Sequence, residues 1–130
     1  MHDFRSDVPG LCDPPEPYSY SVRAGNTIYL AGQVAFDEQL QIVGTTLGEQ
    51  AIQVWRNIES VLAANRATLA DVVKINYYLQ DIRELPHEIE VRRQLFAPGQ
   101  MPAVTAVQAA ALGLAGLKVE VDVIAVVSDD

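Results

Sequence analysis

The chain has 130 residues, a length that fits a single domain with a real core, and 49% of them are apolar. Its 17 acidic residues against 9 basic ones give a net charge of -8, which repels phosphate backbones and anionic membrane surfaces, so we expect neither nucleic acid nor a membrane as a partner. The single cysteine, Cys12, cannot form a disulfide within the chain, and no apolar leader follows Met1, so a cytoplasmic protein is expected.

Residues 1–17 are rich in proline. They contain Pro9, Pro14, Pro15 and Pro17, together with Gly10. Because proline fixes φ and has no backbone N–H, we expect an N-terminal arm without helix or strand over residues 1–17. A single domain is expected over residues 18–130.

Strands are predicted first in this domain. Aromatic and β-branched residues concentrate over 18–23 and 27–34, and the turn at 24–26 joins these two segments as a hairpin. Residues 39–43 are interpreted as a short third strand before Gly44.

Two helices and three further strands follow. The first helix is predicted by a stripe of apolar residues at helical spacing, with Thr45 or Thr46 as its cap: Leu47, Ala51, Val54, Trp55, Ile58, Val61 and Leu62. A strand is predicted over 70–79. The second helix is marked by Leu85, Ile89, Leu95 and Phe96, and Pro98 with Gly99 ends it. The last two strands are predicted over 104–109 and 118–127.

The terminal strand alternates with period 2. Val119, Val121, Val123 and Ala125 point to one face, and Lys118, Glu120, Asp122 and Ile124 point to the other. The order ββαβαββ predicts an α+β fold with two helices on one face of a mixed sheet. The other face, which includes Ile124, is left open and needs a cover.

Five segments in this order and spacing resemble the Rid family (reactive intermediate deaminases, YjgF-like), over residues 17–127. They are Tyr18-Ser19, the turn at 24–26 with the strand through Gly32-Gln33, the segment 71–79, the segment 101–107 (Met-Pro-Ala-Val-Thr-Ala-Val) and the terminal strand. The resemblance implies a chorismate-mutase-like fold and a homotrimer whose three sheets pack into a barrel, with ligand clefts between subunits.

The resemblance also implies a set of cleft residues. Carried over position by position, they are Tyr18, Gly32, Gln33, Val104, Thr105 and Glu120. Three further positions depart from the family: Ala31 stands where serine is frequent, Ala106 where cysteine is frequent, and Ile89 where an asparagine is found. At Val104 the family has an arginine that grips the carboxylate of a 2-imino or 2-enamino acid.

The loss of this arginine changes the expected ligand. A carboxylate in a partly buried cleft without its partner costs roughly 2 to 5 kcal/mol of affinity, so we expect poor binding of imino acids. The four substitutions make the pocket more apolar, which favours a neutral or cationic small molecule. Glu120, without a neighbouring cation, is expected to have a raised pKa suited to general acid/base work. The alternative for Glu120 is a structural role at a subunit interface.

Three functions remain open. The leading hypothesis is a deaminase-type hydrolase that cleaves an imine, an enamine or a related C–N bond with water activated by Glu120. The competing hypothesis is a noncatalytic small-molecule sensor or carrier, or a modulator of a partner enzyme. The weakest is an endoribonuclease or translation inhibitor, which the net charge disfavours. No cofactor is expected, and His2 and His87 have no third ligand spaced to form a metal site.

Overall fold

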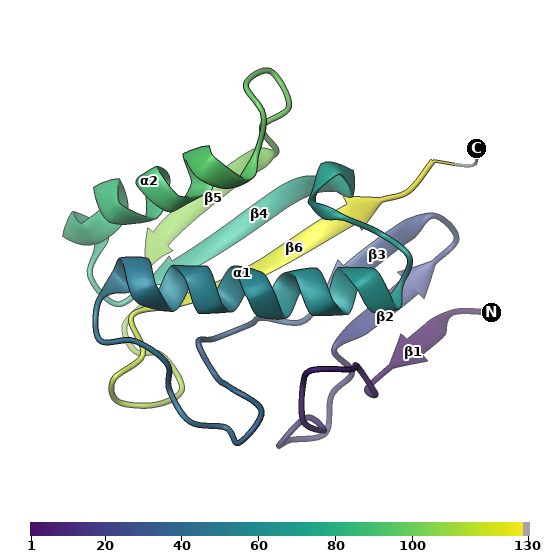
Figure 1. The fold of residues 1–130 in the computed structure, drawn as a ribbon, viewed down its shortest axis with the longest axis horizontal. Helices are drawn as coiled ribbons and strands as arrows, with labels where there is room; N and C mark the ends of the chain where they lie inside the picture. The colour runs from purple at the N-terminus through teal and green to yellow at the C-terminus, as the bar shows by residue number, and fades with distance from the viewer. Residues whose placement is uncertain (129–130) are drawn as a thin grey trace.

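The computed structural model describes residues 1–128, which form one mixed sheet and two helices (Figure 1). The strands are β1 (Asp3–Arg5), β2 (Ser21–Ala24), β3 (Thr27–Leu30), β4 (Val72–Leu79), β5 (Ala103–Gln108) and β6 (Val119–Val126), and the sheet order is β1-β2-β3-β6-β4-β5. The β4–β5 pair is parallel and every other pair is antiparallel. The predicted α+β class is confirmed.

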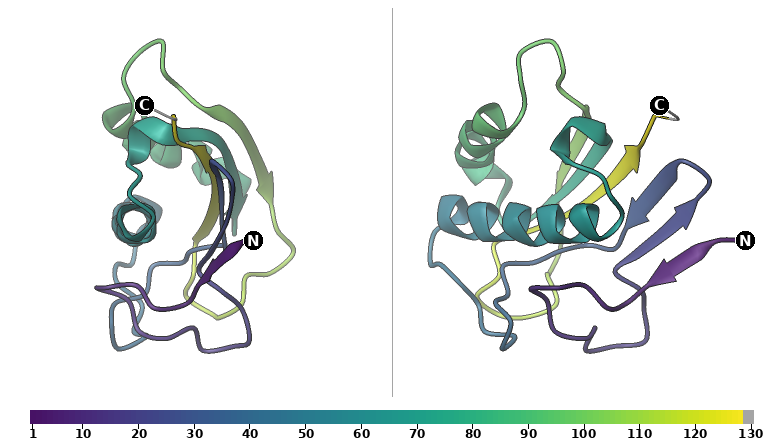
Figure 2. Two further views of the ribbon diagram at one scale, coloured as in Figure 1. Left: turned by 90° about the vertical axis from the view of Figure 1, so that its right-hand side faces the viewer. Right: turned by 45° about the vertical axis from the view of Figure 1, so that its right-hand side comes forward.

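The helices α1 (Leu47–Ala64) and α2 (Leu85–Leu95) both cover the same face of the sheet, as Figure 2 shows in its left view. Short 3₁₀ turns, η1 (Leu69–Asp71) and η2 (Ile82–Glu84), precede β4 and α2. The core lies between this face and the helices. It contains the four alternating residues of β6 that were predicted to face inward: Val119, Val121, Val123 and Ala125.

The start of α1 follows directly from the sequence. Thr46 is the N-cap: its Oγ1 accepts a hydrogen bond from the backbone N–H of Glu49 (3.2 Å), and the Glu49 carboxylate accepts one from the N–H of Thr46 (3.1 Å). This reciprocal capping box satisfies donors that the first helical turn leaves free.

Two expectations about irregular segments were wrong. Residues 3–5 form a strand although the arm was expected to have none, because the prolines begin only at Pro9 and β1 keeps its donors for pairing with β2. Residues 39–43 do not form a strand. Asp37 Oδ1 accepts hydrogen bonds from the N–H groups of Gln39 (2.8 Å) and Gln41 (3.0 Å), so the chain turns there and only the Phe36–Ile42 bridge remains.

The face of the sheet opposite the helices carries exposed apolar side chains. Tyr29, Val73, Val107 and Val126 are each between 42% and 49% exposed, and they come from four different strands. The left view of Figure 2 shows no helix on this side. We call this side the open face.

Candidate functional site

A cavity of about 530 Å³ lies where the N-terminal arm meets the segment 31–40 after β3 and the segment 113–120. It brings together four of the residues predicted from the sequence, namely Tyr18, Ala31, Gly32 and Glu120. The remaining walls come from loops: Pro15, Glu16, Val34, Phe36, Leu40, Gly113, Leu114 and Leu117. We call this cavity the cleft.

Glu120 enters the cleft from β6, where it pairs with Tyr78 of β4 and points to the open face. Its carboxylate lies directly against Gly32: a β-carbon on residue 32 would overlap with the Glu120 side chain. Glycine at this position leaves free the space that the Glu120 carboxylate occupies. Partial burial, and to a smaller extent the charge of Asp122, raise the pKa of Glu120 above its ordinary value.

Tyr18 forms another wall of the cleft. Its ring packs edge-to-face against Tyr20, with 6.0 Å between the ring centroids, and the hydroxyl of Tyr20 donates to the backbone carbonyl of Cys12 (2.6 Å). The arm is thereby fixed beside the cleft. Burial raises the pKa of the Tyr18 phenol, with smaller contributions from the charges of Glu16, Cys12 and Glu120, so Tyr18 is a hydrogen-bond donor at neutral pH.

The charge of the cleft is negative. Its lining residues include the carboxylates of Glu16 and Glu120 and no lysine, arginine or histidine. Apolar and aromatic side chains make up most of the rest. An anionic ligand would meet repulsion here, whereas a neutral or cationic ligand would not.

The predicted residues of β5 lie elsewhere in the protomer. Val104 pairs with the buried Ile75, so it and Ala106 pack against the core on the helix-covered side of the sheet. Glu120 points to the other side. Thr105 also lies on the open face, where its hydroxyl accepts a hydrogen bond from Lys74 Nζ (2.8 Å). Lys74 was not among the candidates for the site. It lies in the predicted strand 70–79, and the structure places its side chain on the open face.

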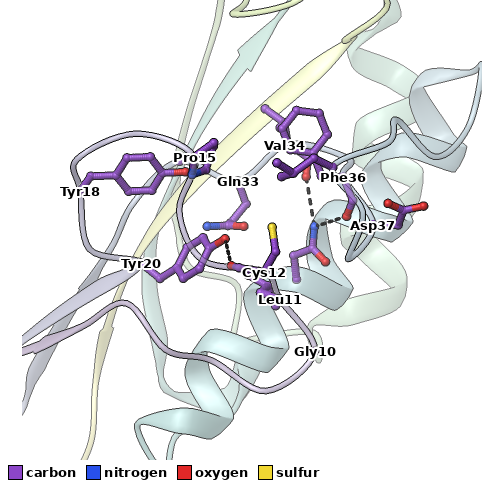
Figure 3. A pocket seen from close by; sticks show the side chains of 13 residues that line it. Gly10, Leu11, Cys12, Pro15, Tyr18, Tyr20, Gln33, Val34, Phe36 and Asp37 are labelled. Atoms are coloured by element: carbon purple, nitrogen blue, oxygen red, sulfur yellow. Dashed lines mark hydrogen bonds between the residues drawn. The ribbon is translucent and has the colours of Figure 1, made fainter.

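Two further candidates are also outside the cleft. Ile89 is half-buried on α2. Gln33 is bound through its backbone to Val121 in both directions (2.8 and 3.0 Å), and its buried side chain lines a smaller cavity of about 50 Å³ (Figure 3). Tyr18, Gly32 and several other cleft residues border this second cavity too. The chain thus holds only part of the predicted set in one place.

Sequence reasoning missed the loop side chains of the cleft. Leu40 and Leu114 are exposed large apolar residues in turns, and Leu40 adopts a positive φ of 60°. Periodicity gives no information in such segments. For Leu114, the signal that could have found it is a leucine between the last two predicted strands, where polar residues are the rule. Leu40 gave no such signal, because it lay in the predicted strand 39–43.

Within residues 1–128, no group of three or more histidine, cysteine, aspartate or glutamate side chains is placed to hold a metal ion. None of the helices in this part of the chain is long and apolar enough to span a bilayer.

Known proteins resemble this chain over nearly its whole length. The family model described as Endoribonuclease L-PSP matches residues 11–127. The chain is 36% identical to the 2-iminobutanoate/2-iminopropanoate deaminase of Mus musculus, over 85% of this chain and 81% of that protein. It is 35% identical to a RutC family protein of Pyrococcus horikoshii, over 76% of this chain and 79% of that protein.

Solved structures agree with these relatives. RidA from the Antarctic bacterium Psychrobacter sp. PAMC 21119 superposes with a TM-score of 0.88 at 32% identity, over 96% of this chain and all of that chain (100%). Yeast Mmf1 gives a TM-score of 0.90 at 26% identity, with 98% and 100% of the two chains covered. The family match, the identities and the shared fold together show that this chain belongs to the Endoribonuclease L-PSP family, the group that contains the RidA and YjgF proteins.

Proposed function

We propose that the protein binds a small neutral or cationic organic molecule in the cleft and hydrolyses an imine, enamine or related C–N bond. The observation that carries the proposal is Glu120: its carboxylate is partly buried against Gly32 in a cavity with a second carboxylate and no cationic lining residue. This environment raises the pKa of Glu120 and brings it closer to the range in which a carboxylate can both take up and return a proton.

The chemistry requires one water molecule. Glu120 removes a proton from the water as its oxygen attacks the imine carbon, and the protonated carboxyl then returns the proton to the nitrogen. Glu120 then transfers the proton of the new hydroxyl group to the nitrogen, the C–N bond breaks, and ammonia or an amine leaves while a carbonyl compound forms. Tyr18 can donate a hydrogen bond to the substrate from the facing wall.

Assembly completes the proposed site. Val104, Thr105 and Ala106 lie away from Glu120 within one protomer, and the open face bears exposed apolar side chains from four strands. Thr105 lies on the open face, so a homotrimer that covers this face would bring Thr105 and the adjoining part of β5 from a neighbouring subunit. Because Val104 stands at the position of the family arginine, this strand provides no guanidinium for a carboxylate.

In this proposal, the protein differs from its deaminase-named relatives in the charge of the substrate that it accepts. We expect little ammonia release from 2-iminopropanoate or 2-iminobutanoate and measurable turnover of an uncharged or cationic imine. The test is to screen amines, amides and lactams by thermal shift and to follow ammonia release from imines of the compounds that bind. For a substrate so found, Glu120→Gln should lower kcat by about 10² to 10⁴-fold with a smaller effect on KM.

The competing function is a noncatalytic binder, a sensor or carrier or a modulator of a partner enzyme. The replacement of the arginine by Val104 favours it, because the same cleft could bind a ligand without reacting with it. The two functions differ in one result. If the protein is a binder, some compounds would raise its melting temperature in the screen but none would be turned over. Glu120→Gln would then change only the affinity for these compounds.

A further inference from the structure

Three arginines gather where α1 ends, on a part of the molecule that shares no lining residue with the cleft. Arg5 comes from β1, Arg23 from β2 and Arg66 from the turn after α1, so three segments distant in sequence meet here. They surround a cavity of about 410 Å³, which is also lined by Asp3, Asn65 and Ser128. We call it the arginine pocket.

This concentration of positive charge contrasts with the acidic composition of the chain as a whole. The protein has 9 basic residues and a net charge of -8, and a third of the basic residues line this one cavity. Asp3 pairs with Arg5 (3.1 Å) and offsets one charge. Two positive charges remain in the pocket. They repel each other, and no other acidic residue in the lining neutralises them.

The arginines differ in how their donors are used. Arg23 has a structural role: its Nη1 donates to the carbonyl of Asn65 at the end of α1 (2.8 Å), and its Nε donates to the carbonyl of Gly25 (3.1 Å). These bonds fix its guanidinium and satisfy a carbonyl that α1 leaves free. The Nε of Arg5, in contrast, is buried and has no acceptor within residues 1–128.

Arg66 is the most informative of the three. It adopts a left-handed backbone with φ of 58°, at the position after a helix where glycine is the favoured residue. No residue in the part of the chain that the structure describes accepts a hydrogen bond from its guanidinium or pairs with it. The chain thus places a long cation where the backbone favours glycine, and neither capping of α1 nor an ion pair accounts for it.

We propose that the arginine pocket binds the phosphate group of a small metabolite. A phosphate monoester carries between one and a half and two negative charges near neutral pH, which matches the two uncompensated charges of the pocket. Guanidinium groups present donors in a fork that fits phosphate oxygens. A carboxylate would neutralise only half of the charge. The carbonyl end of α1 disfavours any anion, so binding rests on the arginines.

The test is a titration of the full chain with inorganic phosphate at low ionic strength, followed by backbone amide NMR and by calorimetry. We expect saturable shifts at residues 5, 23 and 64–66 and none around Glu120. Arg66→Gly should weaken binding at least tenfold while the melting temperature without phosphate stays the same or rises, because glycine suits this φ. Arg93→Ala, which removes an exposed charge from α2, should change affinity less than twofold.

Several results would overturn the proposal: no saturable binding, equal losses in Arg66→Gly and Arg93→Ala, or binding of acetate as tight as that of phosphate. Tighter binding of a single-stranded RNA oligonucleotide than of phosphate would make the pocket a nucleic-acid contact instead. The sequence ends in Asp129 and Asp130, so the titration is repeated with a chain that stops at Ser128. If the shortened chain binds phosphate and the full chain does not, a soluble anion is excluded as the natural occupant of the pocket.

Discussion

The carboxylate of Glu120 occupies the space beside Gly32 that a β-carbon on residue 32 would fill. The contact joins the end of β3 to β6 and holds the carboxylate at the wall of the cleft. The group in the way is the end of a flexible side chain, so a larger residue at position 32 would displace Glu120 before it disturbed the backbone.

Gly32→Ala should therefore separate function from stability. Gly32 does not have a positive φ, so alanine fits the backbone, and the reduced entropy of the unfolded chain offsets part of the contact cost; we expect the free energy of unfolding to change by less than about 1 kcal/mol. Ligand binding in the cleft should fall at least tenfold, as measured by calorimetry. Gly48→Ala, which lies in α1 outside the cleft and meets no atom within 4 Å, is the control. Unchanged affinity in Gly32→Ala would show that the position of the Glu120 carboxylate is unimportant.

Stability should depend on pH through Glu120. Because its pKa is raised by burial, the folded protein binds more protons than the unfolded chain above the ordinary pKa of 4.5, and the free energy of unfolding falls as the pH rises through the folded-state value. Glu120→Gln removes this loss. Its melting temperature should match the wild type near pH 4 and exceed it at pH 7.

The matched control for this measurement is Glu90→Gln, which removes the same charge from an exposed position on α2. The comparison isolates the effect of the cleft from the effect of net charge. A wild type that gains stability relative to Glu120→Gln between pH 4.5 and pH 7 would mean that the assembled protein gives Glu120 a cationic partner.

Val104→Arg should restore affinity for an anion. In the assembled protein, the new guanidinium would pair with the carboxylate of 2-oxobutyrate, and the expected gain is at least tenfold in affinity by calorimetry. Val104 packs against the core next to Ile75, so a cost of about 1 to 3 kcal/mol in urea unfolding accompanies it. Val104→Gln, which introduces a shorter polar side chain without the charge, should also lower stability and should gain no affinity. Robust release of ammonia from 2-iminopropanoate by the wild type would point to another cation, for which Lys74 beside Thr105 is the candidate.

Thr46→Ala should destabilise the fold by about 1 kcal/mol, because it removes one half of the capping box of α1. Thr46→Ser keeps the acceptor and should unfold within a few tenths of a kcal/mol of the wild type. Thr45→Ala is a second comparison, since its hydroxyl makes only a long bond of 3.3 Å to Glu49. Chemical denaturation followed by circular dichroism measures all three. Equal effects of Thr45→Ala and Thr46→Ala would contradict the assignment of the cap.

The open face should be an interface between copies. Light scattering at micromolar concentration should give three times the chain mass of 14.2 kDa. Val107→Lys places a charge on this face and should shift the population towards monomer, whereas Ile52→Lys, at an equally exposed position on α1, should not. A monomeric wild type would remove the neighbouring subunit from the proposed site.

The sequence predicted those parts of the fold whose order is local. The alternation of Val119, Val121 and Val123 identifies one buried face, and the Thr46 cap with its apolar stripe identifies α1, because both patterns depend only on spacing. The strand β1 could not be predicted, since three residues become a strand only when a distant partner, β2, offers its edge. Residues 39–43 were predicted as a strand, but the backbone N–H groups of Gln39 and Gln41 donate to the Asp37 carboxylate and the chain turns there.

The candidate site shows the same division. The resemblance placed Tyr18, Gly32 and Glu120 in one set, and the structure brings them to one cavity. It does not bring Val104 or Ile89 there, because Val104 packs against the core on the helix-covered side of the sheet and Ile89 lies on α2. Leu40 and Leu114 were missed for another reason: their place in the cleft depends on the path of loops, which carry no periodic signal.

The pairing of β1 with β2 has a consequence for the behaviour of the protein in solution. Without residues 1–17, the backbone N–H and C=O groups of Ser21–Ala24 would form a free edge of four residues, available for pairing with another chain. As it stands, the outermost strand is only three residues long and carries Asp3 and Arg5, which makes it a poor template. The arm therefore acts as a built-in protection against aggregation, and a shortened chain should be less soluble even if its core is intact.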